Sequence, residues 1–518
     1  MELAHYLFLL AVLAPAWAIS YWVLPYFTTY RHLKHIPGPF VAKFSNIWLA
    51  LGARQGQKFQ WVDDAHRKYG KVVRVGFNLE SDVSIATPEG LHTVYAHGNG
   101  FLKDEFYNAF VSGVCGVFNV RDRAEHTRKR KIIAHAFSPA AVSQFEHHMS
   151  ANLERWVGQL DNMASHPDKS GYARMNMMPW MTFLAFDIIG DLAFGAPFGM
   201  VQRGRDECES TRPGEAVTYV AGAETLNRRG EVSSTLGLLP EVRPYAKYLP
   251  DSFFRKGLQS VKDLHGIAVA AVTKRLDGVK AASGSSSGRH DILEMLVHST
   301  DADGSPMPQD EVVSEALTQL IAGSDTVSNT SCAVVYWILH GERAAPGTII
   351  PRLVAELDAA MPKGSTIASH ADVKNLPFLR QCIDEGMRLH STSAIGLPRL
   401  VTAKQGVSYG KEHFPEGTVL SVPSYTIHHD ADVWGPDVDE FKPDRWLRLS
   451  PRQKIGFNPF SYGPRACVGQ NVAHMELALI IGTAFHRYDF KLYQEKLESH
   501  EGFSKKPMEC WLGIKKRQ

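Results

Sequence analysis

The sequence predicts a mainly α-helical protein with a small β portion, in the α+β class. Apolar residues recur at helical spacing over most of the chain, whereas short β-branched runs are few. We expect helices over 153–160, 181–194, 261–276, 311–340, 373–389 and 471–487. We expect a hairpin of strands 72–77 and 82–86, and a further strand over 419–422. No repeat or composition shift divides the 518 residues, which indicates a single large core.

An apolar N-terminal segment precedes this core. Residues 3–30 contain no Asp, Glu, Lys or Arg, and the run 6–27 is long enough to cross a bilayer as a helix. A cleaved signal peptide is the alternative, because Ala16-Trp17-Ala18 has the small-x-small form of a cleavage site. The start lacks a basic residue and the apolar run continues past Ala18, which favours an uncleaved anchor over 1–30.

The segment after the anchor is basic and rich in proline. Arg31 and Lys34 follow the span, which by the positive-inside bias leaves the body on the cytoplasmic side. The prolines of 31–39 restrict the backbone, so we expect a stiff hinge there and one domain over 40–518. Two polar stretches, 204–214 and 278–288, are expected to be surface loops, and the helix after the first could be part of a lid over a substrate.

Charge and cysteine content exclude several classes of protein. Lys and Arg total 56 against 54 Asp and Glu, so no overall field favours nucleic acid, and we expect no such partner. Six cysteines are scattered without a C-x-x-C pair or the spacing of a disulfide framework. The body is therefore expected to be reduced.

One of these cysteines, Cys467, lies in the turn FSYGPRACVG (460–469), directly before the predicted helix 471–487. The free N–H groups and the positive dipole end of a helix favour a thiolate there. Gly463 and Gly469 let backbone N–H groups approach the sulfur, and Arg465 adds a cation. This arrangement suits a thiolate ligand of haem iron, and a buried, inert cysteine is the alternative.

The helix expected over 311–340 contains the unusual run AGSDT (322–326). Gly323 would remove a side chain where O2 must fit, and Asp325 could relay protons from bulk water as a general acid. Thr326 could interrupt the helical hydrogen bonds and donate a hydrogen bond to an iron-bound peroxide, or its hydroxyl could simply bond to a preceding carbonyl of the helix. We expect these three residues to be catalytic.

A third motif pairs Glu385 with Arg388, three residues apart on one helix face. An exposed pair worth less than about 1 kcal/mol is one possibility. A buried triad with Arg445, in the later segment FKPDRW (441–446), is the other, and we then expect the triad to be structural.

Together these motifs resemble the cytochrome P450 superfamily. The cysteine turn matches the haem-ligand signature aromatic-x-x-Gly-x-Arg-x-Cys-x-Gly at every fixed place. The resemblance implies the P450 fold with an N-terminal transmembrane helix, and haem b with Cys467 as the metal ligand. It also implies a cofactor-binding set of Cys467, Arg465, Arg130, His126, Arg399, Phe460, Gly463 and Gly469. The chain departs from the family at His126, where tryptophan is usual, and at Val327, where a second hydroxyl is usual.

Longer strings, such as FDIIGDLAFGAPFGM (186–200) and HSTSAIGLPR (390–399), are similar to the fungal benzoate 4-monooxygenases, or benzoate para-hydroxylases. This resemblance implies an endoplasmic-reticulum enzyme, single-pass with a cytoplasmic catalytic domain. It would convert benzoate to 4-hydroxybenzoate with O2 and with NADPH electrons delivered by an NADPH-cytochrome P450 reductase. Residues expected near the substrate are Phe106, Tyr107, Phe110, Val111, Ser112, Gln319, Ala322, Ser393, Ile395 and Leu397.

The substrate carboxylate needs hydrogen-bond donors, because a buried unpaired ion costs several kcal/mol. The available donors are Tyr107, Ser112, Gln319, Ser391, Thr392 and Ser393, with charge from Lys103 or Arg121. The basic run 128–131 could steer an acidic electron donor, or be an ordinary solvated helix face. Alternatives to the benzoate reaction are a P450 monooxygenase of another small aromatic substrate, a haem-thiolate isomerase or dehydratase, and a haem-binding sensor.

Overall fold

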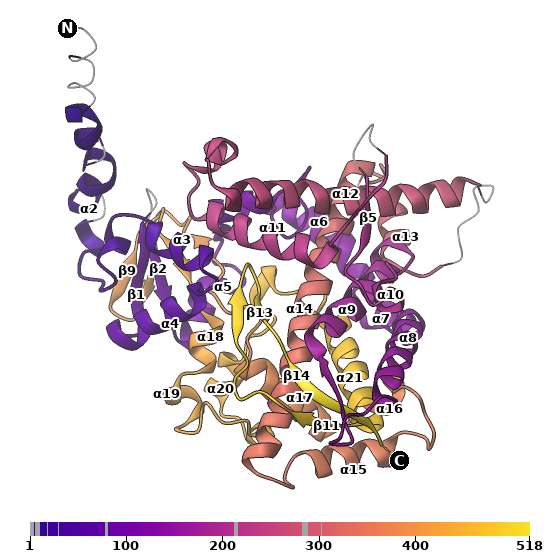
Figure 1. Ribbon diagram of the computed structural model, residues 1–518. Helices are drawn as coiled ribbons and strands as arrows, with labels where there is room; N and C mark the ends of the chain where they lie inside the picture. Colours follow the sequence, from indigo (N-terminus) through magenta and orange to yellow (C-terminus); the bar gives the residue numbers. More distant parts are fainter. Residues whose placement is uncertain are drawn as a thin grey trace.

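The computed structural model describes residues 5, 11–17, 19–28, 31–77, 81–211, 216–281, 289–301 and 303–517. A large helical body lies beside a smaller part in which the sheet of β1 and β2 is packed with α3 and α4 (Figure 1). The C-terminal strands lie against the helical body, and the N-terminal helical segment projects from the β side (Figure 1). The expected α+β class is confirmed.

Helices dominate the described chain. The longer ones are α3 Ile47–Arg54, α4 Lys58–Tyr69, α5 Pro88–Tyr95, α6 Arg123–Ala136, α8 Glu146–Ala164, α9 Met177–Phe194, α11 Gly222–Gly237, α12 Ser252–Ala281, α14 Gln309–Ala344, α15 Ile350–Ala360, α17 Pro377–Leu389 and α21 Gln470–Arg487. The shorter ones are α2 Leu24–Phe27, α7 Pro139–Gln144, α10 Met200–Arg203, α13 Ile292–Val297, α16 His370–Val373, α18 Ser424–His428, α19 Ala431–Trp434 and α20 Pro451–Gly456. Short 3-10 turns include η3 Val41–Lys43, η4 Glu105–Phe110, η5 Arg243–Tyr248, η6 Pro443–Leu447 and η7 Gly463–Arg465.

The largest sheet has five strands in the order β1-β2-β10-β7-β3. These are β1 Val72–Phe77, β2 Ser81–Ile85, β10 Val419–Ser421, β7 Arg399–Leu400 and β3 Leu102–Lys103. β1 and β2 form the predicted hairpin, with Val72 opposite Ile85, and β10 joins β2 in parallel. The sheet thereby brings Lys103 opposite Arg399, a pairing of two segments almost three hundred residues apart.

A second sheet has the order β11-β14-β4, from β11 Tyr488–Leu492, β14 Trp511–Lys516 and β4 Ala173–Asn176. Three two-stranded pairs complete the list: β12 Ser499–Glu501 with β13 Lys505–Pro507, β5 Cys208–Ser210 with β6 Thr218–Val220, and β8 Val407–Tyr409 with β9 Glu412–Phe414. The turn between β12 and β13 matters below, because it reaches the central cavity.

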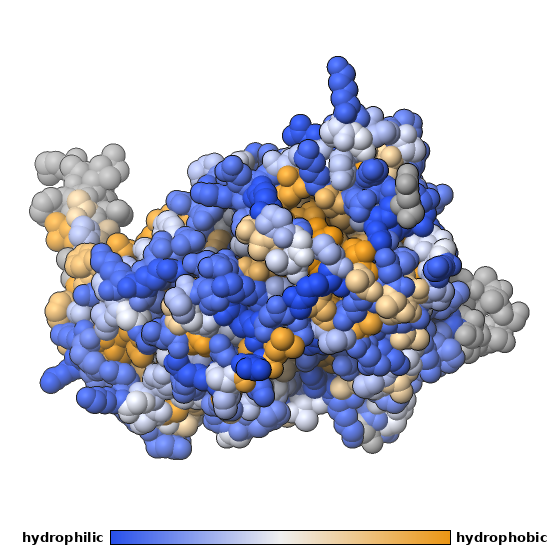
Figure 2. All heavy atoms as spheres, turned by 90° about the horizontal axis from the view of Figure 1, so that it is seen from below, coloured by the Kyte–Doolittle hydropathy of each residue, from blue (hydrophilic) through white to orange (hydrophobic). Residues whose placement is uncertain are grey.

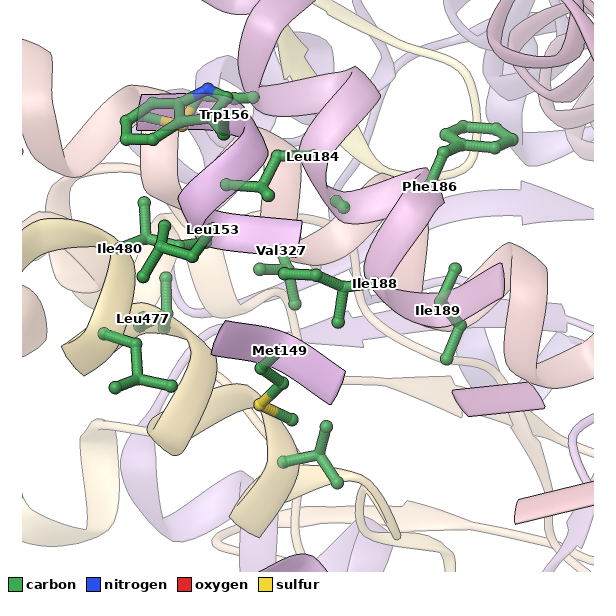
Figure 3. Close-up of a cluster of buried hydrophobic side chains, with 14 of the residues drawn as sticks. Met149, Leu153, Trp156, Leu184, Phe186, Ile188, Ile189, Val327, Leu477 and Ile480 are labelled. Carbon is green, nitrogen blue, oxygen red and sulfur yellow. The ribbon is translucent and has the colours of Figure 1, made fainter. Parts of the chain in front are cut away.

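The core is built where α8, α9, α14 and α21 meet. Leu153, Leu184 and Ile480 come from three different helices and lie together in the buried cluster (Figure 3). Val327, at the place where the family usually has a hydroxyl, is 4% exposed and belongs to the same cluster (Figure 3). The departure therefore adds an apolar side chain to the core.

The predicted helices exist, with differences in extent. The segments at 153–160, 181–194 and 261–276 are parts of the longer helices α8, α9 and α12. The added ends of α8 are mostly polar and lack the apolar pattern used to find the helix, whereas α9 begins four residues earlier, with apolar residues that follow its N-cap, Asn176. The predicted helix 373–389 corresponds to α17 and begins four residues later than predicted, at Pro377; Val373 is the last residue of the separate helix α16, which cannot continue into Pro377. The loop predicted at 204–214 contains β5. In the loop predicted at 278–288, residues 278–281 instead belong to α12, and residues 282–288 lie outside the described residues.

The predicted hinge docks against the sheet. Arg74 of β1 is fully buried; its backbone N–H donates to the Pro37 carbonyl at 2.8 Å and its Nη2 donates to the Leu33 carbonyl at 2.9 Å. A Cβ at Gly38 would lie 2.1 Å from the Arg74 carbonyl oxygen, so the close approach requires glycine. This segment is therefore fixed to the body.

The predicted anchor lies partly outside the described residues. Its described part is helical over 11–17, then forms a π-helical turn, Ile19–Val23, and α2. Within the described ranges, the one helix long and apolar enough to cross a membrane is α9, and 89% of that window is buried in the protein. α9 is thus a core helix.

Most of the face seen from below is hydrophilic, with hydrophobic residues exposed in patches (Figure 2).

Candidate active site

A cavity of about 580 Å³ lies between α14, the start of α21 and the cysteine turn. The residues predicted as catalytic, as cofactor-binding or as near the substrate that line it are Phe110, Gln319, Ala322, Gly323, Asp325, Thr326, Ser393, Leu397, Arg399, Phe460, Arg465, Cys467 and Gly469. Thr392 and Lys103, considered for the substrate carboxylate, also line it. The fold thus brings together segments separated by up to about 360 residues in the chain.

The cysteine turn has a backbone that few other sequences could adopt. Gly463 has φ 74°, and a Cβ there would lie 1.8 Å from the Tyr95 carbonyl oxygen. Ser461, with φ 61°, is the one described non-glycine residue in the left-handed region. The Cys467 N–H donates to the Phe460 carbonyl at 2.9 Å, which closes the turn. By contrast, a Cβ at Gly469 would meet atoms only at ordinary contact distance, the nearest 3.8 Å away.

Cys467 faces the cavity from this turn. Burial raises the pKa of its thiol, while the Gly469 N–H and the Arg130 guanidinium act in the opposite direction. The cation near the sulfur is thus Arg130, which donates to the Ala466 carbonyl at 2.8 Å. Arg465, which the sequence suggested as this cation, donates to the Val120 carbonyl at 2.7 Å.

Arg465 belongs to a second group of cations at the cavity, together with Arg399 and Lys103. Arg399 is 3% exposed; its Nη1 donates to the Tyr107 hydroxyl at 3.0 Å, and its buried Nη2 has no partner in the described chain. Burial and then the neighbouring arginines lower the pKa of Lys103 well below its usual value, and burial chiefly lowers that of Arg465 to about 10. A cluster of buried cations with an unused donor fits an anionic group in the cavity.

His126, the departure from tryptophan, lies beside these cations and not on the cavity wall. It is 6% exposed, and burial together with the surrounding Arg465 and Lys103 charges lowers its pKa to about 3. A neutral ring therefore stands among the cations, so it adds no charge to them.

On α14, the predicted catalytic residues face different neighbours. Thr326 is exposed to the cavity, and its hydroxyl donates to the Ala322 carbonyl at 2.6 Å, the back-bond considered above. The same oxygen keeps its lone pairs for a donor in the cavity. A Cβ at Gly323 would lie 2.8 Å from Ile189 of α9. The missing side chain thus lets α14 and α9 approach each other, whereas the sequence suggested that it makes room for O2 in the cavity.

Asp325 completes this group. Its carboxylate accepts from Asn329 Nδ2 at 3.2 Å, and it lies beside Ser504 of the β12–β13 turn and Lys506 of β13. Burial raises the pKa of Asp325, which the Lys506 charge partly offsets. A carboxyl with a raised pKa on a cavity wall is suited to receiving and releasing a proton.

Glu385, Arg388 and Arg445 lie together but away from the cavity wall. Glu385 and Arg388 are fully buried and joined by two bonds, Nε–Oε2 at 2.9 Å and Nη2–Oε1 at 2.8 Å. Arg445 Nε lies 3.4 Å from Glu385 Oε1. Of the two possibilities left open by the sequence, the exposed pair is therefore excluded.

The predicted substrate residues divide into two groups. Phe110, Gln319, Ala322, Ser393 and Leu397 line the cavity. Phe106 and Ile395 instead line a separate pocket of about 420 Å³, and Tyr107 binds Arg399. Val111 and Ser112 follow η4 and lie outside the cavity wall, with the Ser112 hydroxyl buried and unpaired in the described chain. None of these last five lines the cavity: Phe106, Tyr107, Val111 and Ser112 belong to η4 and the segment after it, whose residues cannot all face one side, and Ile395 faces the other pocket.

Several cavity residues were missed from the sequence. They come from α11, from β13 and the turn before it, and from the loop after η4, and include Phe118, Asn119, Leu226, Arg229, Phe503 and Lys506. Neither α11 nor the β12–β13 turn carries a recognised motif. The helix after the loop 204–214, which is α11, was considered as part of a lid from the sequence, but none of its residues could be singled out.

The basic run 128–131 is largely engaged within the protein. Arg128 binds Asp301 and Glu311, and Lys129 lies between Glu311 and Glu315. These two cations are therefore not available to attract an acidic electron donor, in contrast to the role considered from sequence.

Comparisons with known proteins agree with this geometry. The sequence model of the family described as Cytochrome P450 matches residues 37–509. The chain is 50% identical to a benzoate 4-monooxygenase, bphA, of Aspergillus niger, over 98% of this chain and 97% of the relative. It is 27% identical to the cytochrome P450 monooxygenase cicH of Emericella nidulans, over 95% of each chain, and 29% identical to hepC of Aspergillus oryzae, over 89% and 88%. With a family match over nearly its whole length, the chain belongs to the cytochrome P450 family of haem-thiolate monooxygenases, which use dioxygen.

Proposed function

We propose that this protein hydroxylates benzoate at carbon 4, with haem b held by Cys467. The observation that carries the substrate is the 50% identity, over 98% of the chain, to a protein named benzoate 4-monooxygenase. In the balanced reaction, benzoate, O2, NADPH and a proton give 4-hydroxybenzoate, water and NADP⁺. One oxygen atom enters the ring, and the other leaves as water.

The residues present fit a haem. Cys467 offers a sulfur ligand, the missing side chain at Gly469 leaves space beside it, and Phe460 contributes an apolar wall. The two propionates need cationic donors, which the Arg399–Arg465–Lys103 cluster supplies, Arg399 with an unused N–H. When bound, a haem with a thiolate ligand supplies the chemistry of O–O cleavage. Burial raises the pKa of the thiol, and Arg130, near the sulfur, partly offsets this rise.

Thr326 and Asp325 would deliver protons to the oxygen side of the cavity. The Thr326 hydroxyl, fixed by its bond to the Ala322 carbonyl, presents its oxygen to the cavity. Asp325 exchanges protons with water through its raised pKa and is held by Asn329 and Lys506. We assign Gly323 to helix packing, since Ile189 occupies the space of its missing side chain.

The Glu385–Arg388–Arg445 triad would hold the polypeptide on the cysteine side. Arg388 donates to the carbonyls of His428 and Val438, so one side chain ties α17 to segments that precede the cysteine turn. None of the three lines the cavity, which supports a structural role.

We further propose that residues 1–30 anchor the protein in the endoplasmic-reticulum membrane, with hinge 31–39 and the catalytic domain 40–518 on the cytoplasmic side. Exposed apolar side chains support this: Leu13, Trp17 and Phe27 near the N-terminus are 60%, 61% and 53% exposed. Phe40 of the docked segment is 74% exposed, beside α3. Electrons would come from NADPH through a membrane-bound reductase.

Reconstitution tests this proposal. The full haem-loaded chain, a fungal NADPH-cytochrome P450 reductase and lipid vesicles are incubated with NADPH and benzoate, and the products are separated. We expect 4-hydroxybenzoate in an amount close to the NADPH consumed. Hydroxylation of other aromatic acids but not of benzoate would support the alternative monooxygenase, and NADPH-independent turnover of a peroxide would support an isomerase or dehydratase. Haem binding without any product would favour a sensor.

A further inference from the structure

α11 contributes a buried cation, Arg229, to the cavity wall. Its side chain is 4% exposed, its Nη2 donates to the Phe110 carbonyl at 2.6 Å, and its Nε is buried without a partner in the described chain. No described carboxylate forms an ion pair with it, and its pKa, lowered to about 10, responds to burial alone. Arg229 therefore remains protonated at neutral pH with its charge uncompensated.

Such a charge is costly to the folded protein. An ion removed from water without a counter-ion carries a penalty of several kcal/mol, so a cavity that contains one is arranged for an anion. The cations assigned to the haem seat form a different group: Lys103 of β3 and Arg399 of β7 are paired in the sheet, and the charge of Arg399 lowers the pKa of both Lys103 and Arg465, whereas Arg229 comes from α11. Arg229 is thus a separate positive position.

Lys506 is the other cation on the cavity wall that is not assigned to the haem seat, and it has partners within the protein. Lys506 Nζ donates to Asn227 Oδ1 at 3.3 Å, and its charge acts on Asp325. Among the cavity cations outside the haem seat, Arg229 is therefore the one whose charge no described acidic group balances.

One aromatic ring, that of Phe110, lies beside the guanidinium, and the rings of Phe503 and Phe118 pack around Phe110. Phe503 lies with its ring centroid 4.9 Å from that of Phe110 and 5.5 Å from that of Phe118, both edge-on. The Arg229 guanidinium carbon is 5.8 Å from the Phe110 centroid. Asn119 adds a second polar group, since its Nδ2 donates to the Phe110 carbonyl at 3.0 Å and its Oδ1 is unpaired in the described chain. The combination of flat apolar walls and one cation matches a flat ring that carries one carboxylate.

We propose that Arg229 binds the carboxylate of the aromatic acid substrate and so fixes which ring carbon faces the haem. The guanidinium has a planar fork that matches both carboxylate oxygens, and such charge-assisted pairs are stronger than neutral ones. With the carboxylate held at one end of the ring, the para carbon is the most distant from the anchor. The inference rests on the proposed function and assigns its specificity to one side chain on α11.

The test measures binding by the substrate-induced spectral shift of the haem-loaded full chain. Arg229→Met removes the cation, and Arg229→Gln retains a donor for the Phe110 carbonyl and so protects the fold. Arg228→Met is the matched control, because Arg228 is on the same helix, 39% exposed, and bound to Glu224 outside the cavity. Each protein is titrated with benzoate and with neutral benzamide, after haem content is checked.

For benzoate we expect both Arg229 variants to raise Kd by about 10- to 100-fold, the loss typical of charge-assisted hydrogen bonds. Benzamide affinity should change by less than about threefold, and Arg228→Met should bind both like wild type. Wild-type benzoate affinity in either Arg229 variant, or an equal loss for benzoate and benzamide, would overturn the proposal. If wild type binds benzoate through Arg229 but makes no 4-hydroxybenzoate, the proposed function fails while this inference stands.

Discussion

Removing the Glu385 carboxylate should destabilise the protein strongly. The carboxylate accepts two bonds from Arg388, one from Trp446 Nε1 at 3.0 Å and one from the Lys442 N–H at 3.1 Å, with Arg445 close by. In Glu385→Ala the fully buried Arg388 keeps only carbonyl acceptors. Breaking a buried ion pair costs about 3 to 5 kcal/mol, a large part of the roughly 5 to 15 kcal/mol that stabilises a typical protein.

Denaturant unfolding, followed by circular dichroism and by haem absorbance, measures this effect. Arg388→Ala should lower the midpoint about as much as Glu385→Ala, and the double variant should lose much less than the sum, because one interaction is removed in all three. The control is Asp444→Ala, which breaks an exposed pair with Arg352 and should cost less than about 1 kcal/mol. Midpoints and haem contents equal to wild type in both single variants would refute the buried-triad reasoning.

Two other changes give distinct results. Thr326→Ala should keep its haem content but divert NADPH electrons to hydrogen peroxide. The control is Ser324→Ala, which loses an equivalent hydrogen bond to the Leu320 carbonyl outside the cavity and should convert NADPH to product as efficiently as wild type. An equal ratio of product to NADPH in both variants would exclude the Thr326 role. Burial lowers the pKa of His66 from 6.5 to about 4, so between these pH values the ring is neutral in the folded protein and takes up a proton on unfolding. The contribution of this neutral ring to the free energy of unfolding, at most about 3 kcal/mol, is present above pH 6.5 and lost as pH falls to 4. His66→Gln should therefore reduce the slope of the unfolding free energy against pH between pH 4 and 6.5. An unchanged slope would contradict this.

The sequence predicted the elements whose residues bear a local pattern. The hairpin of β1 and β2 follows from β-branched runs around a turn, and α14 and α21 follow from apolar spacing. The division of α16 from α17 could have been read from Pro377, which stops the preceding helix. β5 and β6 could not, because three-residue strands inside a polar loop exist only through their pairing.

The same distinction applies to the site. Cys467, Thr326 and Asp325 lie in motifs, and all three line the cavity. Arg229 has no motif around it, and its importance depends on what packs over α11: Phe110 from η4 and Phe503 from the β12–β13 turn. Gly323 is the opposite case. It lies in a motif that predicted room for O2 in the cavity, but the space of its missing side chain is next to Ile189 of α9.

The most direct test of the account is the absorption spectrum of the reduced carbonyl adduct, because every proposed role depends on a thiolate at Cys467. We compare the wild-type chain with Cys467→Ser and with Cys115→Ser, the latter removing the other exposed cysteine of the described chain. Wild type and Cys115→Ser should both give the thiolate-type spectrum and form 4-hydroxybenzoate, whereas Cys467→Ser should give neither. A Cys467→Ser protein that retains the thiolate-type spectrum and full activity would contradict the account.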